Sequence, residues 1–294
     1  MGEQVKIAVI GGYGKMGQWF ADFLIKDGKE VVISGRDEKK LLEAKQQLGE
    51  VEIAGTVEAV KGADVILISV PIDAFERVIE EICPYIRPEQ IIIDITSIKV
   101  LPVETMHKHI KTGLILGTHP MFGPGARSMK NQNIVLTPTN EDETALAQKV
   151  KGYLETKGAC VNLMTPREHD EMVAIILGLA HFIAIVSADT LLSFENLKQM
   201  RKIAGTTYKV LLTLIGGVVS RDPEFYATLQ MSLPNMTEIE TLFQRNSKTW
   251  ADLVKTRDKQ EFIRRMNILR DRLEKEEPDF GEAYENIYKL AEGL

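Results

Sequence analysis

The chain has 294 residues, with 36 lysines and arginines against 42 aspartates and glutamates, and a net charge of -6. This length accommodates two domains with a sizeable core, and the acidic balance excludes the overall basic surface of a nucleic-acid-binding protein. Cys83 and Cys160 are far apart and lack metal-ligand spacing, which predicts a reducing compartment and no metal site. The amino terminus does not resemble a signal peptide, and the most apolar run, 172–185, is too short to span a membrane. We therefore expect a cytoplasmic protein without a membrane partner.

The first half of the chain alternates short β-branched runs with helical patterns. This rhythm predicts βαβ units around a parallel sheet, and near-continuous apolar runs are typical of strands buried on both faces. Strands are predicted at Val5–Ile10, Val31–Ser34, Val51–Ile53, Val65–Ser69, Ile91–Asp94, Leu114–Thr118, Ile134–Leu136 and Cys160–Val161. Helices should lie between them, among them 75–82 and 141–157.

The pattern changes near Thr165, after which apolar residues recur every three or four positions. Residues 168–194 are predicted to form one long, mostly apolar helix, and 250–273 and 282–290 to form charged helices. We therefore expect an α/β fold, with a Rossmann-type doubly wound sheet over residues 1–165 and an all-helical domain over 166–294. The long helix is too apolar to face water on all sides, so it is either the core of the second domain or a dimer interface. A homodimer formed through the helical domain is the favoured interpretation.

A glycine motif follows the first predicted strand and begins a helix, which is the full context of a dinucleotide-binding fingerprint. Gly12 permits the tight turn, Gly14 lets the backbone approach a pyrophosphate, and Gly17 lets helix and strand pack closely. The free N–H groups at the helix start suit the anion. A tight turn without a ligand is the alternative. The predicted cofactor-binding residues are Gly12, Tyr13, Gly14, Lys15, Met16 and Gly17, with Ser69 and Pro71 near the nicotinamide end of the cleft.

The end of the second predicted strand indicates which dinucleotide is preferred. An NAD site usually carries an acidic residue there to hold the ribose 2′-hydroxyl, whereas this chain has Ser34 and, close behind, Arg36. A hydroxyl and a guanidinium suit a 2′-phosphate, which a carboxylate would repel. The sequence therefore predicts NADP as cofactor, with NAD as the alternative if Asp37 turns back toward the ribose.

His119 is the strongest candidate for a catalytic residue. Proline at position 120 pushes it toward extended geometry, and the glycines and second proline of the segment that ends at Pro124 force a turn. The residue is thus expected at the carboxyl end of a strand, where open α/β sheets carry their chemistry. A histidine held by backbone groups in a buried turn is the alternative.

Several motifs together resemble the prephenate/arogenate dehydrogenase family of tyrosine biosynthesis, over essentially the whole chain. His-Pro-Met-Phe-Gly-Pro at 119–124 follows an Asp-Ile-Thr-Ser-Ile-Lys strand end at 94–99, in addition to the glycine motif. Downstream, the run formed by His169, Asp170 and His181 and the segment Asp-Pro-Glu-Phe-Tyr at 222–226 also resemble that family.

The resemblance implies an oxidative decarboxylation of prephenate to 4-hydroxyphenylpyruvate, or of arogenate to tyrosine, with hydride passing to the nicotinamide. His119 would accept a hydrogen bond and then the proton from the substrate hydroxyl, and Ser97 would hold the two in register. His169 and His181 would lie near the substrate or cofactor. Ser97 as a helix N-cap, His181 as a core histidine and His169 as a packing residue are the alternatives.

One position departs from the family pattern. The family usually has an arginine shortly before the Asp-Pro pair to hold a substrate carboxylate, but this chain has glycine there. A small anionic substrate still needs a cation, because buried carboxylates are costly without a partner. Arg221 and Lys99 are the candidate substrate-binding cations, with Arg127 and Lys209 as further possibilities, and Arg221 in a surface pair with Asp222 is the alternative.

Two rival functions remain. The first is another NADP-dependent two-domain dehydrogenase such as a β-hydroxyacid dehydrogenase, although the stretch 178–184 lacks the lysine that those enzymes carry on the interdomain helix. The second is a non-catalytic NADP-sensing protein, which would not need His119 and Ser97 at the cleft. Oxidation of a bound substrate distinguishes an enzyme from a sensor.

Overall fold

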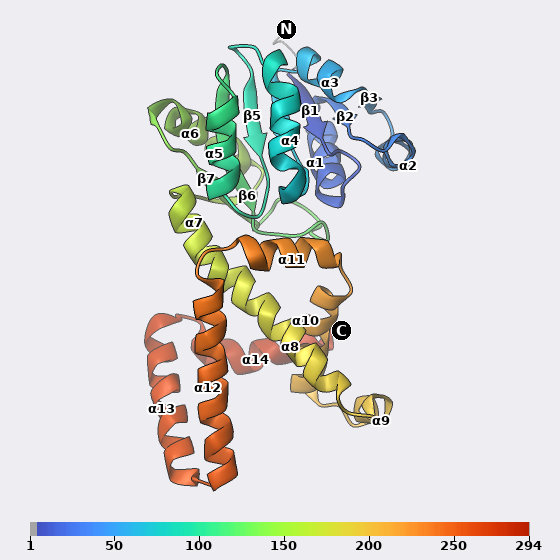
Figure 1. Cartoon of the computed structure of the whole chain (residues 1–294). Coiled ribbons are helices and arrows are strands. Elements are labelled where there is room, and N and C mark those ends of the chain that lie inside the picture. The colour runs from blue at the N-terminus through green and yellow to red at the C-terminus, as the bar shows by residue number, and fades with distance from the viewer. Residues whose placement is uncertain (1–4, 294) are drawn as a thin grey trace. The chain divides into compact units, whose positions relative to one another are not determined.

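Eight strands of the first part of the chain form one sheet with the order β3-β2-β1-β4-β5-β6-β7-β8 (Figure 1). In this computed structural model, which describes residues 5–293, strands lie close to all eight predicted positions. Neighbouring strands from β3 across to β6 are parallel, whereas β7 is antiparallel to β6 and parallel to β8. The strands are β1 (Lys6–Ile10), β2 (Glu30–Ser34), β3 (Glu52–Ile53), β4 (Val65–Ile68), β5 (Ile91–Asp94), β6 (Leu114–Pro120), β7 (Asn133–Thr137) and β8 (Cys160–Leu163).

Helices cover both faces of this sheet, as Figure 1 shows, so its strands are apolar on both sides. Successive residues of β1 illustrate the alternation: Ile7 and Val9 belong to one buried cluster, and Ala8 and Ile10 to the other. The first cluster includes residues of α1, α2 and α6, and the second includes residues of α3, α4 and α5. The helices of this unit are α1 (Lys15–Lys26), α2 (Glu38–Leu48), α3 (Thr56–Gly62), α4 (Ile72–Ile82), α5 (Val100–His109), α6 (Glu141–Thr156) and α7 (Pro166–Val173).

The chain divides into two units, Met1–Val173 and Ala174–Leu294, a little beyond the boundary predicted at residue 165. The second unit is helical throughout its described elements. These are a π-helical stretch (Ala174–Leu179), α8 (Ala180–Leu192), α9 (Leu197–Lys202), α10 (Thr206–Val219), α11 (Pro223–Ser232), α12 (Met236–Thr256), α13 (Lys259–Glu276) and α14 (Ala283–Glu292). The Rossmann-type sheet followed by an all-helical unit is the predicted fold class.

Two predicted elements need correction. Strand β6 continues through Pro120, two residues beyond the predicted end at Thr118, so His119 lies within the last residues of the strand, opposite Val135 of β7. The antiparallel partner β7 extends the strand, which the local sequence did not reveal. The predicted helix 250–273 is two helices, because Arg257 adopts a left-handed backbone conformation (φ 56°) and the Asp258 side chain caps the start of α13.

The long apolar helix exists but is not a buried core. Pro166–Leu192 is continuous, and its most apolar window has a hydropathy of 2.1 with only 28% of that window buried. By length and composition this helix could cross a membrane, contrary to the sequence estimate, although apolar helices of soluble proteins meet the same criterion. Much of the apolar surface of this helix is therefore uncovered in the described chain.

Candidate active site

The glycine loop between β1 and α1 has the shape of a dinucleotide cradle. A Cβ atom on Gly12 would lie 2.6 Å from Cβ of Ile33, and one on Gly17 would lie 2.4 Å from the carbonyl oxygen of Gly11, so neither position accepts a side chain. Gly14 precedes α1 without any side-chain cap, and the first turn of the helix carries no acidic residue. The N–H groups of this turn are therefore left for an anion, which fits the pyrophosphate of NAD or NADP.

The other predicted residues around this loop differ in exposure. Lys15 is exposed, and Tyr13 and Met16 are half-buried. The carbonyl oxygen of Ser69 closes the loop from the end of β4, since a Cβ atom on Gly11 would lie 2.2 Å from it. Pro71 is exposed at the start of α4.

At the end of β2, the structure separates the two residues predicted to hold a 2′-phosphate. Ser34 is fully buried and its hydroxyl lies 3.1 Å from Thr56 Oγ1, so its oxygen is already engaged inside the protein. Arg36 is exposed. Asp37 accepts a hydrogen bond from the Lys40 backbone N–H (3.0 Å) as the cap of α2. Of the two predicted groups, only the guanidinium is therefore accessible.

His119 lies buried near the end of β6, with 4% of its surface exposed. Its Nδ1 is 2.8 Å from Nε2 of His169, and the ring centroids are 5.0 Å apart at an interplanar angle of 68°. Burial, then the neighbouring His169, then Lys99 hold the pKa of His119 well below its usual value of 6.5. The imidazole is therefore neutral near pH 7, the form that can accept a proton.

Lys99 is correctly placed next to the site but has a different role from the predicted one. It is fully buried, and its ammonium pairs with Asp94 and donates to Thr96 Oγ1 (3.2 Å) and to the Thr118 carbonyl (2.6 Å). Burial lowers the pKa of Lys99, and the charges of Asp94 and Asp170 oppose this shift. An ammonium with these three partners and no exposed surface cannot bind a substrate carboxylate, so the prediction for Lys99 is wrong.

Ser97 is half-buried, and among the residues that the structure describes its hydroxyl has no hydrogen-bond partner. The alternative that it caps the following helix is wrong. The carboxylate of Asp170 does this instead, because its oxygens accept the backbone N–H groups of Lys99 (2.7 Å) and Val100 (2.9 Å) at the start of α5. The predicted contact of Ser97 with a substrate hydroxyl stays a prediction.

Asp170 and Asp94 are the residues whose roles the sequence analysis missed. Asp170 also accepts a hydrogen bond at 2.7 Å from Nδ1 of His169, so one carboxylate joins α5 to the His119–His169 pair. The only sequence signal is that it follows His169 directly. Asp94 was placed at a strand end, but nothing local indicated that its partner would be Lys99.

The predicted residues His181 and Arg221 belong to the second unit, where they gather around Tyr226. The His181 ring contacts Tyr226 edge to face, with centroids 4.9 Å apart, and within the described residues its buried Nδ1 has no partner. Burial lowers the pKa of His181. Burial raises the pKa of Tyr226, and the charge of the exposed Arg221 opposes this shift.

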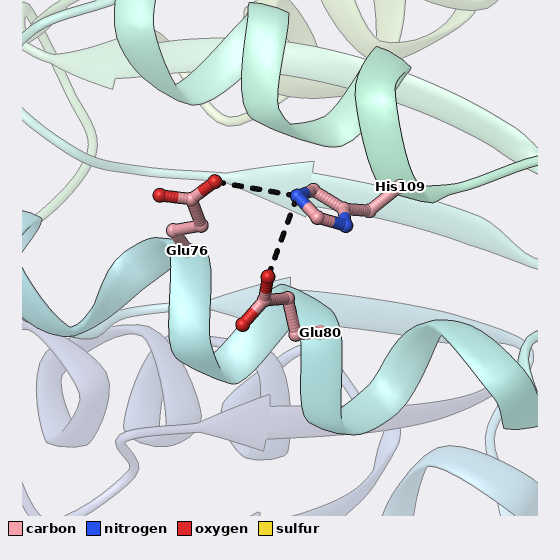
Figure 2. A group of neighbouring side chains, drawn as sticks. All are labelled: Glu76, Glu80 and His109. Atoms are coloured by element: carbon pink, nitrogen blue, oxygen red, sulfur yellow. Dashed lines mark hydrogen bonds and ion pairs between the residues drawn. The ribbon is translucent and has the colours of Figure 1, made fainter.

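Another titratable cluster lies on the outer side of α4 and α5. Figure 2 shows Nε2 of His109 between Glu76 and Glu80, at 3.3 Å and 3.8 Å from one oxygen of each. The three potential ligand atoms lie within 4.8 Å of one another, a spacing that suits a small cation. Lys108 Nζ, however, lies 2.8 Å from the same Glu76 oxygen, and the pKa of Glu76 is lowered first by Lys108 and then by His109. We interpret the cluster as surface ion pairs between the two helices.

Comparisons with known proteins agree with this architecture. Residues 20–163 match the nucleotide-binding domain of prephenate dehydrogenase, and residues 165–268 match the prephenate dehydrogenase dimerization domain. A crystal structure of A. aeolicus prephenate dehydrogenase in complex with hydroxyphenyl propionate and NAD+ superposes with a TM-score of 0.74 at 19% identity, over 93% of this chain and 99% of that one. At this identity the superposition supports the fold alone.

Curated relatives from the same family have a higher sequence identity to this chain than that crystal structure has. A probable arogenate/prephenate dehydrogenase of Methanocaldococcus jannaschii is 36% identical over 88% of this chain and 59% of its own length. The T-protein of Haemophilus influenzae is 30% identical over 90% of this chain and 66% of its own length. The chain thus spans about three fifths to two thirds of the length of these relatives. With two family domains in the expected order on the expected fold, the chain belongs to the prephenate/arogenate dehydrogenase family.

Proposed function

We propose that the protein catalyses the oxidative decarboxylation of prephenate, or of arogenate, with a nicotinamide dinucleotide as oxidant. The observation that carries this proposal is the buried His119 near the carboxyl end of β6, on the sheet edge where the glycine loop also lies, with burial lowering its pKa. Family membership supplies the substrate class. When bound, the nicotinamide supplies the acceptor for the hydride that leaves the hydroxyl-bearing ring carbon.

His119 is assigned the proton transfer. As hydride leaves, the substrate hydroxyl becomes a carbonyl and its proton passes to the imidazole. Loss of carbon dioxide from the resulting dienone delivers two electrons to the ring, which becomes a phenolate. The imidazolium then returns the proton to the same oxygen. One histidine therefore both accepts the proton from the substrate oxygen and returns it. A lowered pKa suits this, because the imidazolium gives up its proton readily.

The proposed cofactor preference is NADP, resting on Arg36. Its guanidinium is exposed beyond β2, while one carboxylate oxygen of Asp37 accepts the Lys40 backbone N–H at the start of α2. The related A. aeolicus enzyme was crystallised with NAD+, so NAD is the competing cofactor. Charge reversal at Arg36 should raise the KM for NADP far more than the KM for NAD, and equal effects would contradict the proposal.

The second unit is proposed to form a homodimer and to supply a cation for the substrate. Its family model is a dimerization domain, and the exposed apolar side chains of α8 need a cover. Arg221 is the proposed substrate cation. It is exposed, its charge acts on Tyr226, and Tyr226 in turn contacts the His181 ring. The proposed location is the cytoplasm.

The decisive experiment is reduction of NADP and NAD at 340 nm by the purified protein, with prephenate and arogenate added separately. A rise with either substrate supports the proposal and identifies that substrate. No rise in absorbance with either substrate, together with measurable dinucleotide binding, would overturn the proposal. His119→Asn tests the assignment of the base in the same assay, and the matched control is His109→Gln in the surface cluster.

A further inference from the structure

A chain of three side chains begins at His119 and ends at a carboxylate inside the first unit. His119 Nδ1 lies 2.8 Å from His169 Nε2, and His169 Nδ1 lies 2.7 Å from Asp170 Oδ1. All three residues are buried, with exposed fractions of 4%, 1% and 3%. Few solvent molecules can therefore compete for these contacts, and each ring nitrogen in the chain must be matched to the next group.

The direction of both hydrogen bonds follows from Asp170. Its two oxygens accept the backbone N–H groups of Lys99 and Val100, so the carboxylate is held as an acceptor by donors that cannot reverse. Nδ1 of His169 must therefore donate. In the neutral form of His169, which carries one N–H, Nε2 accepts and Nδ1 of His119 donates to it. Among the residues that the structure describes, no hydrogen bond occupies the remaining nitrogen of neutral His119, Nε2, so its lone pair is free.

The same chain supplies a charge for the protonated state. Lys99 and Asp94 neutralise each other in a buried ion pair, whereas Asp170 has no cationic side chain hydrogen-bonded to it in the described part of the chain. This leaves one negative charge two hydrogen bonds away from His119. When a proton arrives at Nε2 of His119, the new positive charge forms next to His169 and within reach of that carboxylate. In a buried site such a charge is worth more than in water.

We propose that His169 and Asp170 are positioning residues for His119: they hold it in the tautomer whose Nε2 accepts the substrate proton, and Asp170 stabilises the imidazolium that forms. The first half of this inference concerns the substrate-free protein and is independent of the reaction. The second half rests on the proposed function.

The tautomers can be measured directly. The chain has five histidines, so long-range proton–nitrogen correlation spectra of protein labelled with 15N-histidine are simple to assign with single variants. At about pH 8, above the usual histidine pKa, His119 and His169 should both carry hydrogen on Nδ1, whereas free histidine prefers Nε2. In Asp170→Asn the Nδ1–H form of both rings should decrease. Wild-type His119 with hydrogen on Nε2 would overturn the inference, whether or not the protein is a dehydrogenase.

Kinetics test the second half. Asp170→Asn should lower kcat by about 10²- to 10⁴-fold, as loss of an orienting carboxylate behind a catalytic histidine does elsewhere, with NADP affinity changed less than a few-fold. Glu171→Gln, at the exposed neighbouring position of the same helix, is the matched control and should leave kcat unchanged.

A substitution pair at His169 separates positioning from simple packing. His169→Gln keeps an oxygen that can accept from His119 and an N–H that can donate to Asp170, whereas His169→Leu fills the space without either. The glutamine variant should retain at least tenfold more kcat than the leucine variant. Equal kcat in the two, or wild-type kcat in Asp170→Asn, would overturn the positioning role. If neither substrate is turned over by the wild type, the proposed function fails while the spectra still decide the tautomer.

Discussion

The two units of this protein handle burial in opposite ways. The first unit buries charge and polarity deep in its core and pairs almost every group, as Lys99 with Asp94 and Asp170 with two backbone N–H groups show. The second unit buries few large side chains and leaves many apolar ones exposed. Among its most exposed apolar residues are Ile203 at 87%, Met231 at 86% and Leu192 at 71%.

This contrast indicates where each unit obtains its stability. A sheet covered by helices on both faces encloses its own core, and only such an enclosed core can hold a buried ionic network at fixed geometry. A set of helices with uncovered apolar faces depends on a further surface for burial. We therefore expect the first unit to carry chemistry that needs fixed protonation states. The second unit is expected to associate with another protein surface.

The largest expected effect is on turnover in the first unit. His119→Asn should lower kcat by about 10²- to 10⁴-fold, because a positioned base contributes that much to a proton transfer. Affinity for NADP should stay within a few-fold, since the glycine loop is untouched. Steady-state kinetics and dinucleotide titration check both values. Turnover equal to that of the wild type would remove His119 as the base.

The next effect is on stability. Lys99→Met should lower the free energy of unfolding by about 3–5 kcal/mol, because it leaves the buried carboxylate of Asp94 without its cation. Removing both charges in Lys99→Met with Asp94→Asn should recover part of this loss. Urea denaturation of the two variants measures the difference. Equal stabilities would mean that the ion pair is not the reason for the loss.

A third prediction concerns the uncovered surface of the second unit. Leu192→Glu and Ile203→Glu should weaken self-association while leaving the fold of each unit intact, because a charge in an apolar interface is unpaired when the interface closes. Sedimentation velocity over a range of concentrations measures the shift. Lys198→Ala, on the neighbouring helix α9, is the control. A wild-type protein that is monomeric at every concentration would contradict the predicted dimer.

The pH dependence of stability should differ between the units. His119 has a pKa below 6.5 in the folded protein, so between that pKa and 6.5 the unfolded chain binds more protons and acidification destabilises the fold. The slope from one such group is at most about 1.4 kcal/mol per pH unit. His119→Asn should reduce the slope measured by urea denaturation between pH 7.5 and 5.5. His181, whose pKa is also lowered but which is less buried, should contribute less.

The smallest effect is expected at the surface cluster of Figure 2. Glu80→Gln removes one carboxylate near His109, but Glu80 faces solvent, which screens the pairing. Thermal unfolding should show no measurable change. A clear loss of stability on adding a chelator to the wild type would instead indicate a bound cation at this cluster.

Much of the fold could be predicted because the signals are local. β-branched runs separated by helical patterns located all eight strands, and the glycine motif identified the first βα turn because only glycine fits where Gly12 and Gly17 approach neighbouring chain. The break at Arg257 was missed because a left-handed non-glycine residue has no strong sequence signature. The extension of β6 was missed because it depends on a distant strand.

By itself, then, the sequence determined the class of fold and the family and singled out His119 as the candidate base, since all of these rest on residue types at short spacing. Only the tertiary structure decided the partners of that histidine. Lys99 turned inward because Asp94, from the end of β5, offered it a buried counter-charge, and Ser34 because Thr56 offered its hydroxyl a partner. His169 and Asp170, 50 residues and more along the chain, reach His119 only when α7 packs beside β7 and α5. Charged and hydrogen-bonding groups find their partners among residues that the fold brings together from distant parts of the chain. Local sequence patterns do not indicate these partners.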